Sequence, residues 1–88
     1  MNEKELERVL KASANRRRLA IIKFLKKQKE ASVGDIATEI KLSFRATSKH
    51  LALLTHAGII DREQRGLQMY YSIISNLPEV ARRIIALL

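Results

Sequence analysis

The chain contains no cysteine, which excludes disulfide bonds and metal sites built from thiolates. It also lacks any apolar run near the ~18–20 residues that a membrane-spanning helix needs. The first residues are acidic and polar, unlike the basic start and apolar core of a secretory signal. We therefore expect one small domain over residues 1–88 that works in the cytoplasm and has no membrane partner.

Acidic residues are scarce relative to basic ones. Nine Asp and Glu residues stand against 17 Lys and Arg residues, and the formal net charge is +8. A balance of this sign favours nucleic acid or another anionic surface as a partner, although a charge that only keeps the chain in solution is the alternative. We find no repeat, low-complexity segment or linker in the sequence.

Patterns typical of catalysis are missing as well. The two histidines, His50 and His56, are six positions apart on one predicted helix and point about 120° from each other, so they do not form a metal-chelating pair. No Ser-His-Asp order, phosphate-binding glycine loop or pair of carboxylates stands out. We predict that the chain is not an enzyme and binds no cofactor and no metal.

The clearest feature that is present is a helix with its own start and stop signals. Ser43 can serve as its N-cap, and Gly58 can adopt the left-handed conformation that ends a helix. At about 100° per residue one face carries Phe44, Thr47, Leu51 and Leu54, and the other carries Arg45, Ala46, Lys49 and Ala52. This second face is basic and free of acids, as a helix that enters the DNA major groove requires.

A second amphipathic segment lies immediately before this helix. Its apolar stripe predicts a helix over residues 33–40, with Ser32 as N-cap and Asp35 at the acidic position of a capping box. The short connection of residues 41–43 joins the two helices into a helix-turn-helix. Two further helices are predicted upstream, over residues 3–12 and 16–28, the second capped by Asn15.

After Gly58 the pattern changes to a period of two, which predicts a β-hairpin. The two alternating runs cover residues 59–64 and 69–74, and Arg65-Gly66 supplies the turn between them. Asn76 or Ser75 then caps a last helix with Pro78 in its first turn. The predicted fold is α+β and mostly helical, a winged helix-turn-helix with the order α-α-α-α-β-β-α.

The chain resembles the ArsR family of winged helix-turn-helix repressors in three segments. The segments that are similar to the family's recognition helix are Leu42-Ser43, Ser48-Lys49-His50-Leu51, Leu54 and Ala57-Gly58-Ile59-Ile60. Residues 10–12 and 18–22 resemble the entry to the second helix, and residues 61–73 resemble the wing. The resemblance implies a homodimer that binds double-stranded DNA at an inverted-repeat operator and regulates transcription, more often by repression.

The metal-sensing positions of that family are not matched here. Many members sense metals or metalloids through cysteines, but those positions hold Ala31, Val33 and Asp35. A second metal site of the family uses acids and histidines on the terminal helices, and the last helix here has only Glu79 as a possible ligand. The resemblance therefore implies a regulator that does not respond to metal by either known route, and its effector is unknown.

The DNA contacts are predicted on the recognition helix and the wing. His50 could instead be structural, and Ser48 could bond its own backbone. Phe44 is expected in the core, although at a helix start it could reach a thymine methyl group. The predicted DNA-binding residues are Ser43, Arg45, Ala46, Ser48, Lys49, His50, Arg62, Gln64 and Arg65.

Two basic features outside the recognition helix carry expectations of their own. Residues 16–18 are three arginines at a helix N-terminus, where positive charge opposes the helix dipole, so we expect an external anion to compensate them. Lys26, Lys27 and Lys29 are expected to be solvated. Lys41 stands where the family often has glycine, so a left-handed backbone at this position is strained.

Apolar stripes on the first and last helices predict a dimer, because one small domain cannot bury both and exposed apolar patches are usually avoided. The predicted interface residues are Leu6, Val9, Leu10, Leu77, Val80, Ala81, Ile84, Ile85 and Leu88. The alternative function is a winged-helix module that binds another protein and uses its charge to stay in solution. A basic helix on a membrane surface fits poorly, because the apolar side of the second helix belongs to the domain.

Overall fold

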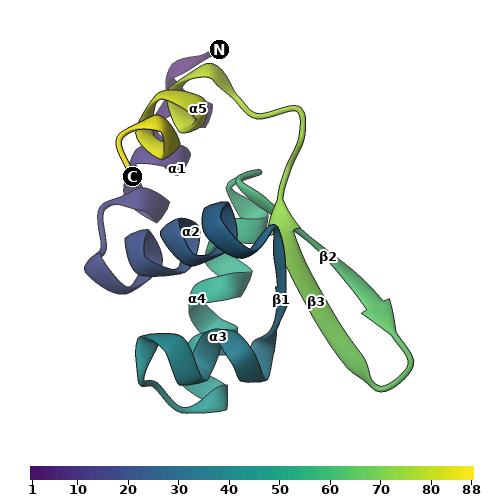
Figure 1. The fold of residues 1–88 in the computed structure, drawn as a ribbon. Helices are drawn as coiled ribbons and strands as arrows, with labels where there is room; N and C mark the ends of the chain where they lie inside the picture. Colours follow the sequence, from purple (N-terminus) through teal and green to yellow (C-terminus); the bar gives the residue numbers. More distant parts are fainter.

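The computed structural model describes residues 1–88 and confirms the predicted winged helix-turn-helix fold (Figure 1). The elements are α1 (Glu3–Ser13), α2 (Arg16–Gln28), β1 (Glu30–Ser32), α3 (Val33–Ile40), α4 (Phe44–His56), β2 (Ile60–Arg65), β3 (Gln68–Ile73) and α5 (Glu79–Ala86). The order is therefore α-α-β-α-α-β-β-α, with one strand more than the sequence predicted.

The additional strand is β1, which the sequence analysis missed. It pairs antiparallel with β3, with Ala31 opposite Tyr71, and completes a three-stranded sheet of order β1-β3-β2. Three residues are too few to display an alternating pattern, and the last of them, Ser32, also caps α3. Only pairing with a distant segment makes this stretch a strand.

The core lies where α2 meets the other helices and the sheet. Helix α2 packs against α1, α3, α4 and α5 and against strands β1 and β3. The largest fully buried side chains are Ile21, Ile22, Leu25, Ile36, Leu51, Leu54, Ile59 and Ile60. Because Ile21, Ile22 and Leu25 in α2 and Leu51 and Leu54 in α4 recur at helical spacing, the inward faces of these two helices follow directly from the sequence.

Local capping signals set most of the helix boundaries as predicted. The side chains of Asn15, Ser32 and Ser43 each accept a hydrogen bond from the backbone amide three residues later, at 3.1–3.2 Å. At the other end of α4, Gly58 has φ +77°, and the amides of Gly58 and Ile59 donate to carbonyl groups of the last turn at 3.0 and 3.1 Å.

The start of α5 differs from the prediction, whereas the backbone at Lys41 has the conformation that the sequence analysis considered. Helix α5 begins at Glu79, with Pro78 as its N-cap and no side-chain cap, so the prediction that Ser75 or Asn76 caps it is wrong. The proline ring disfavours a helical conformation at Leu77, and the helix cannot start earlier. Lys41 is left-handed (φ +57°), the conformation for which strain is expected at a position without glycine.

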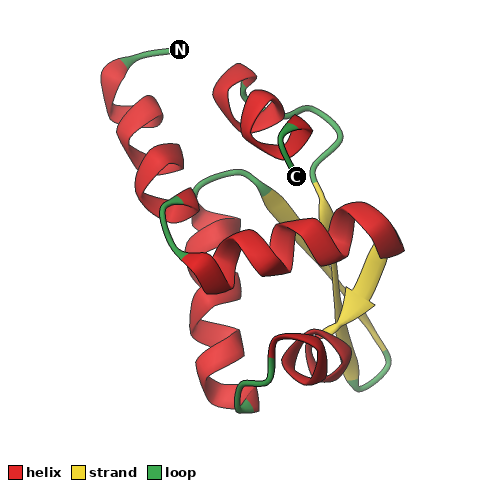
Figure 2. Ribbon diagram, turned by 60° about the vertical axis from the view of Figure 1, so that its left-hand side comes forward, coloured by secondary structure: helices red, strands yellow, loops and turns green.

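The terminal helices and the wing lie at opposite ends of the molecule. Helices α1 and α5 pack together at the upper end in Figure 1, and the start of α4 and the tip of the β2–β3 hairpin lie at the lower end. The turned view in Figure 2 shows the same separation. The two surfaces that the sequence assigned to assembly and to DNA therefore do not overlap.

Candidate nucleic-acid interface

Helix α4 divides into a buried and an exposed side. Thr47, Leu51 and Leu54 are buried against the core. On the opposite side Arg45 and Lys49 are exposed, and neither side chain forms an ion pair within the protein. Because the helix N-terminus also carries a partial positive charge, this side presents a surface that attracts phosphate.

The other residues at α4 that are predicted to contact DNA are less accessible or already hydrogen-bonded within the protein. Ser43 is exposed, but its hydroxyl accepts the amide of Ala46 and serves as the helix cap. Ala46, Ser48 and His50 are half-buried. Of the six predicted residues on α4 and at its N-cap, only the two cations are both exposed and free of a side-chain hydrogen bond within the protein.

The pairing register of the wing sorts its side chains onto two faces. Arg62 lies opposite Tyr71, and Gln64 lies opposite Met69. Residues directly opposite one another in an antiparallel pair share a face, and Tyr71 is buried against the helices. Arg62 and Gln64 are exposed and extend this helix-facing side of the sheet beyond the core, as a DNA contact from the wing requires.

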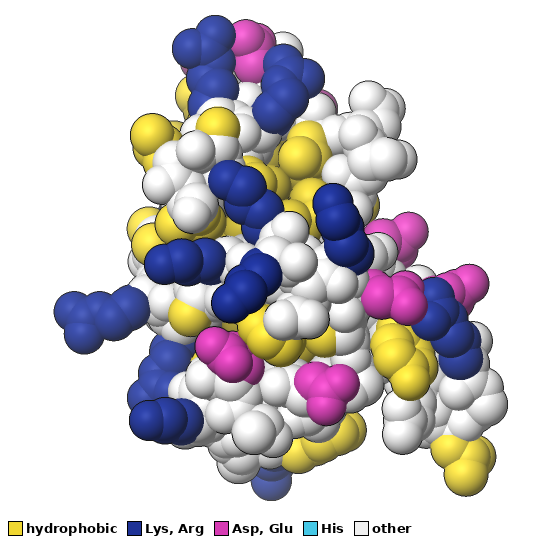
Figure 3. All heavy atoms as spheres, viewed as in Figure 1, with side chains coloured by type: hydrophobic (Ala, Val, Ile, Leu, Met, Phe, Trp, Pro, Cys, Tyr) yellow, Lys and Arg dark blue, Asp and Glu magenta, His cyan; other side chains and the backbone are white.

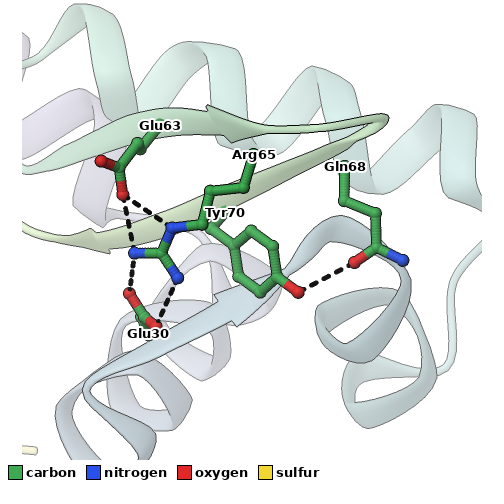
Figure 4. A network of polar contacts seen from close by, with 5 residues as sticks. All are labelled: Glu30, Glu63, Arg65, Gln68 and Tyr70. Carbon is green, nitrogen blue, oxygen red and sulfur yellow. Dashed lines mark hydrogen bonds and ion pairs between the residues drawn. The ribbon is translucent and has the colours of Figure 1, made fainter.

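Arg65 lies on the other face of the wing and is held there by two carboxylates (Figure 4). Its guanidinium donates to the two oxygens of Glu30 at 2.8 and 2.7 Å and to Glu63 at 2.8 Å. It also lies 4.7 Å above the centre of the Tyr70 ring. These hydrogen bonds lower the pKa of Glu30 and raise the pKa of Arg65.

The position of Arg65 changes the interpretation of its role. Glu30 belongs to β1, so the ion pair joins the tip of β2 to the far edge of the sheet. Sequence reasoning missed Glu30 because β1 itself was not predicted. Arg65 lies near the wing tip as expected, but its donors are already engaged, and its contact with DNA stays a prediction.

The arginines at the start of α2 stabilise the ends of other helices. Arg17 donates to the carbonyl oxygen of Ile40, at the end of α3. Arg18 donates from Nε to Ala12 at 2.5 Å and from Nη2 to Lys11 at 3.2 Å, at the end of α1. The expectation that an external anion compensates them is therefore wrong for Arg17 and Arg18, because helix carbonyl groups do so.

His50 combines a structural contact with a position at the interface. Its Nδ1 accepts a hydrogen bond from Arg18 at 3.3 Å, because a guanidinium can only donate. Partial burial, and then the charges of Arg18 and Arg17, lower the pKa of His50. The neutral ring therefore carries its proton on Nε2, which leaves that nitrogen as a donor.

Phe44 is exposed, so the prediction that it faces the core is wrong. Its relative exposure is 64%, although its helical phase is close to that of Leu51. Helical phase gives the direction of a side chain but not how far the neighbouring elements extend. At the first residue of α4 the core has already ended, and the ring borders an open cleft of about 270 Å³ beside the wing.

The predicted dimer residues divide into buried and accessible groups. Val9, Ala81 and Ile85 are buried inside the protomer, where α1 packs on α5, so they offer little surface to a partner chain and their place in a dimer interface stays a prediction. Leu6 and Leu10 are exposed at 36% and 47%. The half-buried members are Leu77, Val80, Ile84 and Leu88.

The structure contains no group of three or more His, Cys, Asp or Glu side chains that could hold a metal ion. None of its helices has the length and apolar character needed to cross a bilayer.

A helix-turn-helix followed by a hairpin that flanks its second helix defines the class of winged helix-turn-helix DNA-binding domains. Within that class, the family model described as bacterial regulatory protein, ArsR family, matches residues 15–62. The chain belongs to the ArsR family. It is thus a DNA-binding transcriptional regulator, and its relatives are regulators rather than enzymes, as predicted.

Individual relatives share both sequence and fold with this chain. The transcriptional activator HlyU from Vibrio cholerae is 35% identical over 82 residues, which cover 85% of this chain and 75% of HlyU. The arsenical resistance operon repressor from Escherichia coli is 31% identical over 77 residues, covering 88% of this chain and 66% of the repressor.

Solved structures give the same result. A structure of HlyU from Vibrio cholerae superposes with a TM-score of 0.83 at 34% identity and covers 99% of this chain and 94% of its own. The homodimeric winged helix-turn-helix domain of Mb0332 from Mycobacterium bovis has a TM-score of 0.82 at 33% identity, covering 96% of this chain and 74% of its own.

Proposed function

We propose that the protein is a homodimeric repressor that reads an inverted-repeat operator with α4 and its wing. The observation that supports this most directly is the basic, acid-free side of α4, where Arg45 and Lys49 have no partner within the protein. Arg62 and Gln64 extend the same surface onto the wing. Phosphate contacts from these cations supply affinity, and side chains that reach base edges supply sequence choice.

The proposed dimer forms through the terminal helices. Leu6 and Leu10 leave apolar surface exposed on α1, and Leu87 adds an 86% exposed leucine next to α5. The related domain of Mb0332 is described as homodimeric. A two-fold axis at this end leaves both α4 helices free for half-sites about 34 Å apart, one turn of DNA.

Repression requires only that the protein occupies a promoter. Of the named relatives, the Escherichia coli protein is a repressor and HlyU is an activator. We propose repression because DNA contacts alone can exclude polymerase. Transcription in vitro from a promoter that overlaps the operator should fall as protein is added, and a rise in transcript would contradict this part.

We also propose that metals do not control DNA binding. The positions that hold thiolates in many family members carry Ala31, Val33 and Asp35, of which only Asp35 has a possible ligand atom in its side chain. Zinc, cadmium or arsenite should therefore leave DNA affinity unchanged. A metal that bound tightly and released the DNA would contradict this.

A selection experiment tests the role of α4. The wild-type protein selects preferred sites from a library of random duplexes, and Arg45→Ala is then measured on the selected site and on unrelated DNA. If Arg45 reads a base edge, the variant should lose about 1–3 kcal/mol on the selected site only. Lys27→Ala, which changes an exposed lysine near the end of α2 that is expected to be solvated, serves as the control. Unchanged binding by Arg45→Ala and Lys49→Ala on every sequence would exclude α4 as the reader.

A further inference from the structure

Two large apolar side chains are exposed at the end of the molecule that we assign to DNA. Phe44, the first residue of α4, is 64% exposed, and Leu67, in the hairpin turn, is 103% exposed. Both border one open cleft, whose lining residues are Ser32, Val33, Gly34, Phe44, Leu67, Gln68 and Met69. Leu67 contributes no burial to the fold and Phe44 keeps most of its surface exposed, so folding accounts poorly for these residue types.

The surroundings of Phe44 are suited to nucleic acid. Arg45 follows it directly, Lys41 lies three residues before it, and α4 contains no acidic residue. The amides at the N-terminus of α4 add a partial positive charge at the same place. An apolar ring framed by positive charge matches a ligand that is anionic outside and has apolar groups within reach.

Thymine supplies such a group in the DNA major groove. Its C5-methyl is the apolar feature of the otherwise polar edges that the bases present there, and phenylalanine is one of the side chains that contact it. We propose that Phe44 is a specificity-determining residue that packs on a thymine methyl group in each half-site of the operator. The proposal rests on the proposed function and adds a base preference to it.

Leu67 provides a matched control within the same cleft. It is more exposed than Phe44, but it lies in the wing turn and not on the helix that enters the major groove. Thymine and uracil are identical on their minor-groove edges, because the methyl group projects into the major groove. A loss of affinity caused only by removing the methyl group should therefore depend on Phe44 and not on Leu67.

The test compares thymine with uracil in the operator. Each thymine of a duplex selected by the wild-type protein is replaced in turn by uracil, which removes one methyl group and leaves charge and base pairing unchanged. Wild-type affinity should fall about fourfold for each methyl contacted, and about tenfold or more when both half-sites are changed. Phe44→Ala should bind the thymine and uracil duplexes alike, and Leu67→Ala should retain the difference.

Two other kinds of result would contradict either the role of Phe44 or the proposed function. Equal binding of the wild-type protein to all thymine and uracil duplexes would overturn the proposal, as would a difference that persists in Phe44→Ala. Failure of the wild-type protein to bind any duplex at low salt would instead overturn the proposed function. Thermal unfolding of Phe44→Ala, expected to match the wild type because the ring is exposed, shows that the variant is folded.

Discussion

Thr47 is completely buried in α4, and its hydroxyl group finds no hydrogen-bond partner in the protein. An unpaired buried hydroxyl reduces stability, because it loses its hydrogen bonds to water without replacement. Thr47→Val keeps the shape and removes the hydroxyl, so the free energy of unfolding should rise by about 1 kcal/mol. Urea unfolding measures the change.

Thr55→Val is the control for this prediction. Thr55 lies on the same helix, and its hydroxyl donates to the carbonyl oxygen of Leu51 at 2.8 Å. Because that hydroxyl has a partner, its removal should not stabilise the protein. A Thr47→Val variant that is less stable than the wild type would show that the hydroxyl has a partner after all.

His50 should make stability depend on pH in a known direction. Burial and the neighbouring Arg18 and Arg17 lower its pKa below the ordinary value of 6.5. As pH falls below about 6.5, the unfolded chain takes up a proton that the folded protein resists, so stability decreases until pH passes the lowered pKa. Above about pH 7 this contribution is constant.

The measurement is urea unfolding of wild type and His50→Gln between about pH 5 and 8, the range in which histidine titrates. The variant should lose less stability on acidification than the wild type does. His56→Gln, which changes the exposed histidine of the same helix, should behave like the wild type. Identical pH profiles for His50→Gln and the wild type would show that His50 does not cause the effect.

At the scale of elements, the ion pair between Arg65 and Glu30 links the end of β2 to β1, and we expect it to restrain local opening of the wing. The bidentate pair connects β2 to β1 across β3. Because the pair is exposed, we expect a local effect and little change in global stability. Glu30→Gln and Arg65→Ala should both speed amide hydrogen exchange in β2 and in the first half of β3.

Glu79→Gln is the matched control for the wing. It breaks an exposed ion pair with Arg83 on α5, at the other end of the molecule, and should leave exchange in the hairpin unchanged. Hairpin exchange that is the same in Glu30→Gln and the wild type would mean that the ion pair between Arg65 and Glu30 does not restrain the wing, and the DNA-contact role predicted for Arg65 would gain support.

The helices could be predicted because their signals are local. Asn15, Ser32 and Ser43 cap the helices that follow them, and Gly58 ends α4, within a few residues of the chain. The hairpin was equally visible from its alternating pattern and from Gly66 in the turn, which has φ +63°. Elements of this kind follow from sequence without knowledge of their tertiary neighbours.

What escaped prediction depends on distant partners. Strand β1 exists because it pairs with β3, and Glu30 meets Arg65, which is 35 positions away in the chain. Phe44 has the helical phase of a core residue but lies beyond the end of the core. Val9 and Ala81 were predicted at the dimer interface, and the sequence did not show that α1 and α5 cover them within one protomer.

At the scale of the whole molecule, the positive charge is widely spread. Lys and Arg side chains are scattered over the face shown in Figure 3, from the terminal helices at the top past α2 to the lower end and the wing. Some of the basic side chains stabilise the fold: Arg17 and Arg18 donate to helix carbonyl groups, and Lys26 donates to the carbonyl oxygen of Ile85 at 3.1 Å. A net charge of +8 favours long-range attraction of DNA, and under the proposed function we expect the cations of α4 and the wing to determine the docked position.

Leu10 offers the cleanest test of the proposed dimer. Its side chain is 47% exposed in the protomer, so Leu10→Glu should leave the protomer folded and place charge in the interface. Light scattering at micromolar concentration should show a dimer for the wild type and a monomer for the variant. Leu67→Glu changes an exposed leucine on the wing and should remain dimeric. A monomeric wild type would exclude assembly through α1 and α5.

The most direct test of the central claim is the salt dependence of binding to duplex DNA, measured by fluorescence anisotropy. If a dimer neutralises about six to ten phosphates, the logarithm of the association constant should fall with the logarithm of salt concentration at a slope of roughly −5 to −9. Lys49→Ala should reduce the slope by about two, one phosphate in each protomer. A slope near zero, or no binding at low salt, would contradict DNA recognition by this surface.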